Sequence, residues 1–176
     1  MANAPRSGES AVDDFAAGLF RALGYARRNR VVHTRKTDVC IIDRDQNDIL
    51  LLVQEDKRYE EGDGADPEAQ LIAEAIAAFD TNNKQRVRAD LDSLDEKIMP
   101  GITMMGTAPT FYKIPVTNDL QQHVAQGTYP PNPTCVMFCQ PPVPRPARRY
   151  SEGMKPLDNR CQILSCYEAF KTIIGI

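Results

Sequence analysis

The pattern of hydrophobic positions begins with a helical period. One face of a helix would collect the apolar residues Val12, Phe15, Ala16, Leu19, Phe20 and Leu23. Ser10 can cap this helix, with Asp13 as the acidic half of a capping box, and Gly24 ends the apolar run. The sequence therefore predicts a first helix that starts near Ser10 and ends before Gly24.

Three strand-like stretches follow. Residues 30–34 and 37–43 come first, and a polar turn at 44–48 separates them from the strongest candidate, residues 49–57. This last stretch is apolar as far as Val53 and then becomes polar. The pattern predicts antiparallel strands joined by a short turn.

The remaining pattern alternates between helices and strands. Asp66 followed by Pro67 is typical of a helix start and predicts a second helix to about residue 89. Pro100-Gly101 is expected to break the chain before strands at 102–106 and 110–116, and a short helix is expected at 119–125.

Seven of the 13 prolines lie between Pro130 and Pro146, which favours extended chain, and a last helix is expected at 159–174. The order α-β-β-β-α-β-β-α predicts one mixed α/β (α+β) domain over residues 1–176, with a central mixed sheet flanked by helices. We expect its core to cover about 10–126, and residues 127–176 to form a proline-rich appendage and the C-terminal helix.

Composition places the chain among globular proteins. Hydrophobic residues make up 42% and charged residues 26% of 176 residues, which excludes wholesale disorder. No apolar run approaches the roughly 18 residues of a membrane span, and residues 1–10 hold no apolar stretch typical of a secretory signal. We therefore expect an intracellular protein, in cytoplasm or nucleus, that is not secreted and does not enter a membrane.

The net charge of −3 hides two segregated runs. A basic run holds Arg27, Arg28, Arg30, Arg35 and Lys36. An acidic run holds Glu60, Glu61, Asp63, Asp66 and Glu68. The basic run directly precedes Asp38, so it is expected to flank a site there and to bind nucleic-acid phosphates. The acidic run is expected to gate entry to the site or to collect cations. The alternative for both is solvated charge on loops.

The end of the third strand carries the candidate chemistry. Side chains of a strand alternate between faces, so Glu55 and Lys57 share one face with Val53. Asp38 begins the preceding strand, and antiparallel pairing would bring it beside Glu55 and Lys57 at one end of the sheet. Two carboxylates and a lysine there suit a hard divalent cation, Mg²⁺ or Mn²⁺, and phosphate chemistry.

Asp38 followed by Glu55-Asp56-Lys57 after a hydrophobic strand resembles the PD-(D/E)xK nuclease superfamily, which has a restriction-endonuclease-like fold with an α-β-β-β-α-β core. The resemblance covers about residues 10–116, and Thr37 stands where the motif name has proline. It implies that Asp38 and Glu55 are metal ligands, with the main-chain carbonyl of Asp56 as a third ligand.

The same resemblance implies that Lys57 is the catalytic lysine of the motif and that Gln70 lies near the site. It also makes one acid of the first helix (Glu9, Asp13 or Asp14) a further candidate ligand. The implied function is a metal-dependent nuclease, with DNA favoured over RNA and a homodimer possible by analogy.

Several alternatives stay open from the residues. Asp38, Glu55 and Lys57 can form an ion-pair network at a sheet edge, and the chain can be an inactive nuclease-like fold that only binds nucleic acid or protein. A structural or interaction domain is a third interpretation. His33 is either an extra metal ligand or a surface or phosphate contact. The cysteines at 135, 139, 161 and 166 are interpreted as buried thiols, with structural zinc as the alternative.

Overall fold

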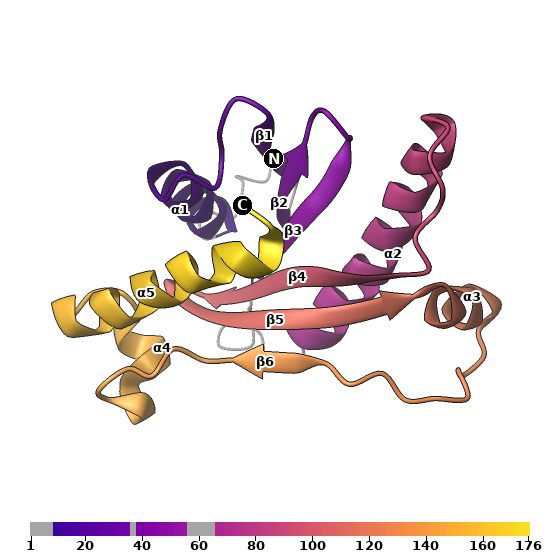
Figure 1. Ribbon diagram of the computed structural model, residues 1–176. Helices are drawn as coiled ribbons and strands as arrows, with labels where there is room; N and C mark the ends of the chain where they lie inside the picture. The colour runs from indigo at the N-terminus through magenta and orange to yellow at the C-terminus, as the bar shows by residue number, and fades with distance from the viewer. Residues whose placement is uncertain (1–8, 36–37, 56–65) are drawn as a thin grey trace, which may run out of the picture.

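The computed structural model describes residues 9–35, 38–55 and 66–176, and its centre is a mixed six-stranded sheet with helices on both faces (Figure 1). The predicted mixed class is thereby confirmed. In chain order the elements are α1 (Glu9–Ala22), β1 (Arg30–Arg35), β2 (Asp38–Asp43), β3 (Asp48–Glu55), α2 (Pro67–Arg88), β4 (Glu96–Met105), β5 (Ala108–Thr117), α3 (Asn118–Gln126), β6 (Met137–Cys139), the 3₁₀ turn η1 (Pro146–Arg148), α4 (Arg149–Glu152) and α5 (Leu157–Ile174).

The strands lie side by side in the order in which they occur along the chain. β1, β2 and β3 form an antiparallel meander, β3 pairs parallel with β4 through the α2 crossover, and β5 and β6 continue antiparallel. A parallel pair needs such a crossover, and α2 supplies it. Among the described strands, β1 and β6 are the two edges.

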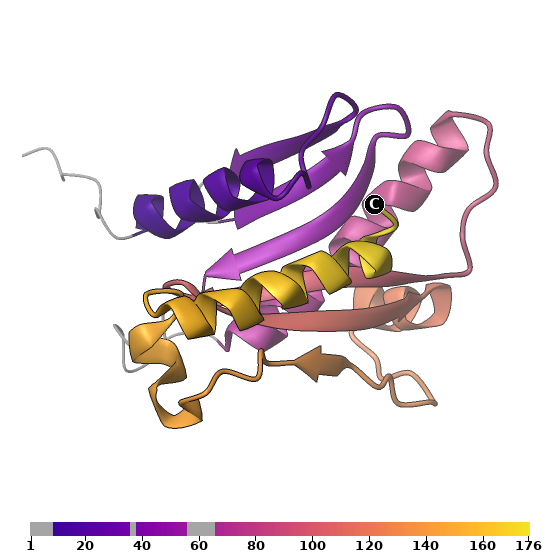
Figure 2. The ribbon, with the colours of Figure 1, turned by 60° about the vertical axis from the view of Figure 1, so that its left-hand side comes forward.

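Two apolar layers hold the helices on the sheet. α1 covers β1 to β3, and α5 covers β4 and β5 on the same face (Figure 2). Their shared cluster includes Phe20, Val53 and Tyr167. α2 covers the opposite face, where Leu71 and Phe79 pack against strand residues such as Leu52. Alternation along β3 therefore sends neighbouring residues into different layers.

Local signals explain the position of α2. The Asp66 carboxylate accepts the main-chain N–H of Glu68 at 3.1 Å, and Pro67 occupies the first turn. At the other end of the helix, the buried Asn82 side chain accepts the N–H of Ile49 at 2.8 Å and donates to its carbonyl at 3.0 Å. These bonds hold α2 against the start of β3.

β4 corrects the expected break at Pro100-Gly101, because the strand runs through both residues. The β3–β4 ladder begins at Gly101, and Pro100 is paired with Lys113 of β5. The N–H that proline lacks therefore removes no hydrogen bond from the described β3–β4 ladder. Gly101 fits because an added Cβ would lie 2.8 Å from Leu71 Cδ2. The pair is thus compatible with this strand rather than a breaker of it.

The C-terminal helix belongs to the core, which we had expected to end near residue 126. α5 buries Ile163, Tyr167 and Phe170, and the Tyr25 hydroxyl donates to the Tyr167 carbonyl at 2.6 Å. The proline-rich chain before it runs extended and includes β6, a strand that the sequence pattern did not predict. Among the described helices, none is long and apolar enough to cross a membrane.

Candidate functional site

The pairing of β2 with β3 brings Asp38 and Glu55 to the same end of the sheet. Asp38 lies opposite Gln54 in the register, one position from Glu55, which is the last residue of β3. Asp38 is described here by its main chain alone. The pairing thus confirms the shared sheet end, but its register matches Asp38 with Gln54, so by strand alternation the position of Asp38 belongs to the face of Gln54 and not to that of Glu55.

Glu55 is half-buried at this end. Alternation from the core residue Val53 puts the Glu55 side chain on the face that α1 and α5 cover. Gln54 is buried on the other face, and its amide donates weakly to the Glu55 carbonyl at 3.4 Å. Asp56 and Lys57, the other two residues of the motif, lie outside the described residues.

Gln70 lies at the same end of the sheet but in the α2 layer. Asn82 of α2 contacts Ile49 of β3. The twelve helical residues from Asn82 back to Gln70 span about 18 Å, and the five strand residues from Ile49 to Gln54 span about 17 Å. Gln70 is half-buried and donates to Glu74 Oε1 at 3.2 Å. The first turn of α2 is thus level with the end of β3.

The acids of the first helix differ in exposure. Asp13 is buried and Asp14 is exposed, while Glu9 begins the helix. Asp13 is therefore the one of these two whose carboxylate is held inside the protein. Among the described residues, no three histidine, cysteine or acidic side chains gather in a group that could hold a metal ion.

The basic run separates into two places. Arg35 pairs with Asp38 at one end of the β1–β2 ladder, whereas Arg30 pairs with Asp43 at the other end. Arg27 and Arg28 precede Arg30 and lie at that far end with it. The expectation that the whole run flanks Asp38 therefore does not hold for these three arginines, and Lys36 lies outside the described residues.

A polar hollow of about 320 Å³ marks the far end, and its lining comprises Arg27, Arg28, Asn29, Arg30 and Asp43. The sequence had suggested the arginines but not Asn29 or Asp43. The missing signal is the turn that folds Arg27 back onto Arg30, because nothing in the hydrophobic pattern announces it.

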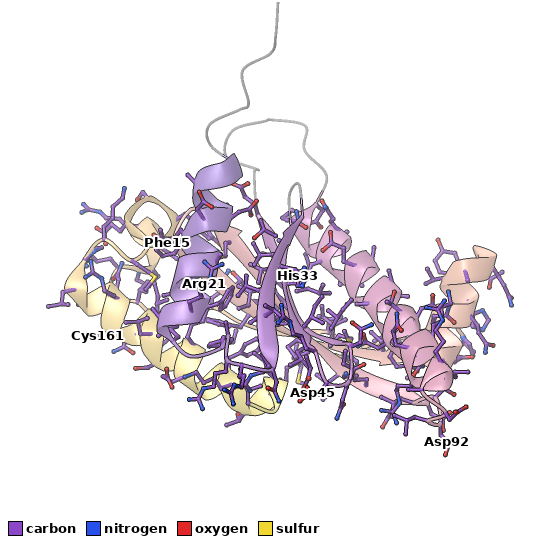
Figure 3. The ribbon with its side chains drawn as sticks, turned by 90° about the horizontal axis from the view of Figure 1, so that it is seen from above. Phe15, Arg21, His33, Asp45, Asp92 and Cys161 are labelled. Carbon is purple, nitrogen blue, oxygen red and sulfur yellow. The ribbon has the colours of Figure 1, made fainter. Side chains whose placement is uncertain are left out.

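His33 and the cysteines have surface positions. His33 is exposed on β1 opposite Cys40 (Figure 3). The prediction of buried thiols is wrong for Cys135, Cys139 and Cys161, which are exposed; Cys166 is half-buried. Cys139 lies on the short edge strand β6, and Cys161 lies off the buried stripe of α5. Of the acidic run, only Asp66 and Glu68 lie within the described residues, and Glu68 accepts the Tyr112 hydroxyl at 3.2 Å.

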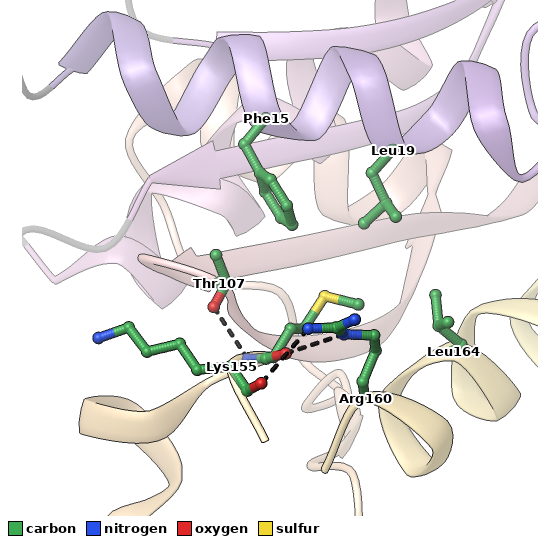
Figure 4. A pocket seen from close by; sticks show the side chains of 7 residues that line it. Phe15, Leu19, Thr107, Lys155, Arg160 and Leu164 are labelled. Atoms are coloured by element: carbon green, nitrogen blue, oxygen red, sulfur yellow. Dashed lines mark hydrogen bonds between the residues drawn. The ribbon is translucent and has the colours of Figure 1, made fainter. Parts of the chain in front are cut away.

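An apolar hollow of about 380 Å³ lies between α1 and α5 (Figure 4). Phe15 and Leu19 point into it from α1, and Leu164 points in from α5. The Arg160 side chain at its rim donates to main-chain carbonyls of Met154 and Lys155 at 3.1 and 3.3 Å. The described residues that line this hollow include no carboxylate, so its chemistry differs from that of the Asp38–Glu55 end.

No family model matches the chain, and no curated protein or solved structure matches it.

Proposed function

We propose that this chain is a divalent-metal-dependent nuclease that hydrolyses phosphodiester bonds, with DNA as the favoured substrate. The observation that carries the proposal is the β2–β3 pairing, which brings the main chains of Asp38 and Glu55 to the same end of the sheet. Because Asp38 is paired with Gln54, a cation shared by Asp38 and Glu55 would bind around the strand ends and not on one face of the sheet. The element order α1-β1-β2-β3-α2-β4 agrees with the α-β-β-β-α-β order of a restriction-endonuclease-like core. Both features support the proposal.

The donor set suits a hard cation. In the proposed site the carboxylates of Asp38 and Glu55 and the main-chain carbonyl of Asp56 hold Mg²⁺ or Mn²⁺, which accept oxygen ligands together with water and phosphate oxygens. Such an ion lowers the pKa of bound water and neutralises charge on a phosphate. Glu55 is half-buried, and its Oε2 atom is shielded from solvent.

Two further residues have positioning roles in this proposal. The Lys57 ammonium orients the attacking water and stabilises the extra negative charge on the phosphate. Gln70, level with the strand end, contributes a side-chain amide at the rim of the site. A duplex cut on both strands would be served by a two-fold dimer of such sites. We also infer an intracellular location from this substrate.

A cleavage assay tests the proposal. Purified protein is incubated with supercoiled DNA or with RNA, with Mg²⁺, Mn²⁺ or a chelator. We expect metal-dependent cleavage of DNA that is lost in Asp38→Ala and Glu55→Ala at every salt concentration. Asp92→Asn, a change in an exposed loop carboxylate at the far end of α2, is the control and should retain activity (Figure 3).

The outcomes separate the alternatives. Binding of nucleic acid without cleavage under any of these metals would favour an inactive nuclease-like module. Cleavage that survives both Asp38→Ala and Glu55→Ala would contradict the proposed site, whatever the substrate.

A further inference from the structure

The turn between α1 and β1 holds three arginines in a fixed arrangement. Arg27 and Arg30 exchange two main-chain hydrogen bonds of 3.0 Å each, and the Arg44 N–H donates to the Asn29 carbonyl at 2.7 Å. Gly24, with φ +75°, lets the chain leave α1 at this point. The polar hollow at the far end of β1 is therefore built on a hydrogen-bonded backbone.

The charge of this hollow is unbalanced. In the described part of the chain, the guanidinium groups of Arg27, Arg28 and Arg30 form no ion pair, and Asp43 is the one carboxylate that lines the hollow. Asp43 Oδ1 accepts the N–H of Asp45 at 2.8 Å, and the Asp45 carboxylate accepts the Asn29 amide. Both acids thus bond to neutral donors, while the arginines stay available for an anion.

Phosphate is the ligand chemistry that fits. Guanidinium groups present several donors in a planar fork that matches phosphate oxygens, and arginine is always charged. No acidic residue occurs between Arg27 and Thr37. The edge strand β1, which leads away from the hollow, therefore carries no negative side chain that would repel a polyanion. The exposed His33 and Thr34 lie on this edge.

The distance between the arginine-lined hollow and the Asp38 end of β2 defines how long a ligand must be to contact both places. Arg30 and Arg35 are five residues apart on β1, opposite Asp43 and Asp38, so the two ends are separated by about 17 Å. A B-form duplex advances about 3.4 Å per base pair, which makes this about five base pairs.

We propose that the turn Arg27–Arg30 is a distal phosphate clamp that holds the nucleic-acid backbone about five base pairs from the phosphate at the Asp38–Glu55 end. The substrate class is accordingly an extended duplex, and a mononucleotide or trinucleotide engages only one of the two places. This inference rests on the proposed function for the second place, while the clamp itself is defined by its own residues.

Metal-free binding measures the clamp without cleavage. The anisotropy of a labelled duplex of about 20 base pairs and of a labelled trinucleotide is followed over a range of salt concentrations in chelator. Arg28→Gln and Arg30→Gln are compared with Arg88→Gln, which removes the same charge from the exposed end of α2. We expect each clamp variant to flatten the log–log salt slope for the duplex by about one unit. Arg88→Gln should leave that slope unchanged, and the trinucleotide, which engages one place only, should bind the wild type more weakly than the duplex does.

Each outcome decides one proposal. An unchanged duplex slope in both clamp variants, no duplex binding by the wild type, or wild-type binding of the trinucleotide as tight as that of the duplex would overturn the clamp. A flattened slope without metal-dependent cleavage would support the clamp and contradict the nuclease. Cleavage by wild type and clamp variants with unchanged slopes would contradict the clamp alone.

Discussion

At the scale of single residues, Asn82 has the clearest structural role. Its side chain is 1% exposed and satisfies both main-chain groups of Ile49, which fixes α2 against the start of β3. Asn82→Ala leaves these two groups without their partner, so we expect a loss of about 2–3 kcal/mol in the free energy of unfolding. Urea denaturation measures the change.

Thr81→Ala in the preceding position is the control, because the exposed Thr81 hydroxyl bonds back to the Ala77 carbonyl of its own helix. A change within about 0.5 kcal/mol is expected there. Equal losses in the two variants would show that the helix, and not the Asn82–Ile49 contact, determines the effect.

Two glycines should respond to alanine with opposite signs. An added Cβ at Gly101 meets the fully buried Leu71, whereas at Gly18, on the exposed side of α1, it meets nothing within 4 Å. We expect Gly101→Ala to lower the free energy of unfolding by about 1–3 kcal/mol. Gly18→Ala should raise it by about 0.5–1 kcal/mol. Thermal unfolding of the two variants side by side tests the packing of α2 on β4, and the same sign in both would contradict it.

At the scale of elements, the bounds of a helix or strand could be predicted from the sequence where one local pattern was strong. The helical period that ends at Gly24, the polar turn before β3 and the Asp66-Pro67 start gave α1, β3 and α2 close to their observed bounds. β4 was missed at its start because Pro100-Gly101 has the local appearance of a break, and only the neighbours of that strand make it compatible. β6 was missed because a strand of three residues within a proline-rich segment is too short to show an alternating pattern of hydrophobic and polar positions.

The docking of α5 could not be predicted because it depends on contacts far apart in the sequence. Arg145 in the proline-rich segment donates to both Asp158 oxygens at 2.8 Å and to Glu152 at 2.8 Å. These hydrogen bonds hold the pKa of the Glu152 and Asp158 carboxyls below their ordinary values. The same contacts connect the extended chain to the start of α5.

This connection predicts a pH effect. A carboxyl whose pKa is lowered by folding stabilises the protein above its unfolded pKa, and that stability is lost as the pH falls through the folded value. In Arg145→Gln we expect the pKa of both carboxyls to rise towards ordinary values and the acid-side loss of stability to become shallower. NMR titration of the carboxyl groups measures the first effect, and unfolding from neutral pH to about pH 3 the second.

Lys171→Gln is the matched control, since Lys171 pairs with Glu168 on α5 and not with Glu152 or Asp158. Unchanged carboxyl pKa values in Arg145→Gln would mean that Arg145 does not hold the segment in solution.

At the scale of the whole molecule, the sheet decides which charged residues can act together. Sequence order alone joined all five basic residues to Asp38, but β1 carries Arg30 and Arg35 to opposite ends of one ladder. The meeting of Asp38 with the end of β3 was predictable, because a short polar turn joins two apolar strands antiparallel. The register that pairs Asp38 with Gln54 was not predictable, because it depends on an irregularity between Ile41 and Ile42. The separation of the arginines depends on where β1 begins, which the pattern defines less sharply.

The central claim is that Asp38 and Glu55 share a divalent cation, and calorimetric titration with Mn²⁺ tests it most directly. The wild type and Asp92→Asn should bind with the same Kd. Asp38→Ala and Glu55→Ala should each raise the Kd at least about a hundredfold, because the loss of groups that merely support a ligand already costs about 10–100-fold. Mn²⁺ binding that is equal in all four proteins, or absent from the wild type, would contradict the claim.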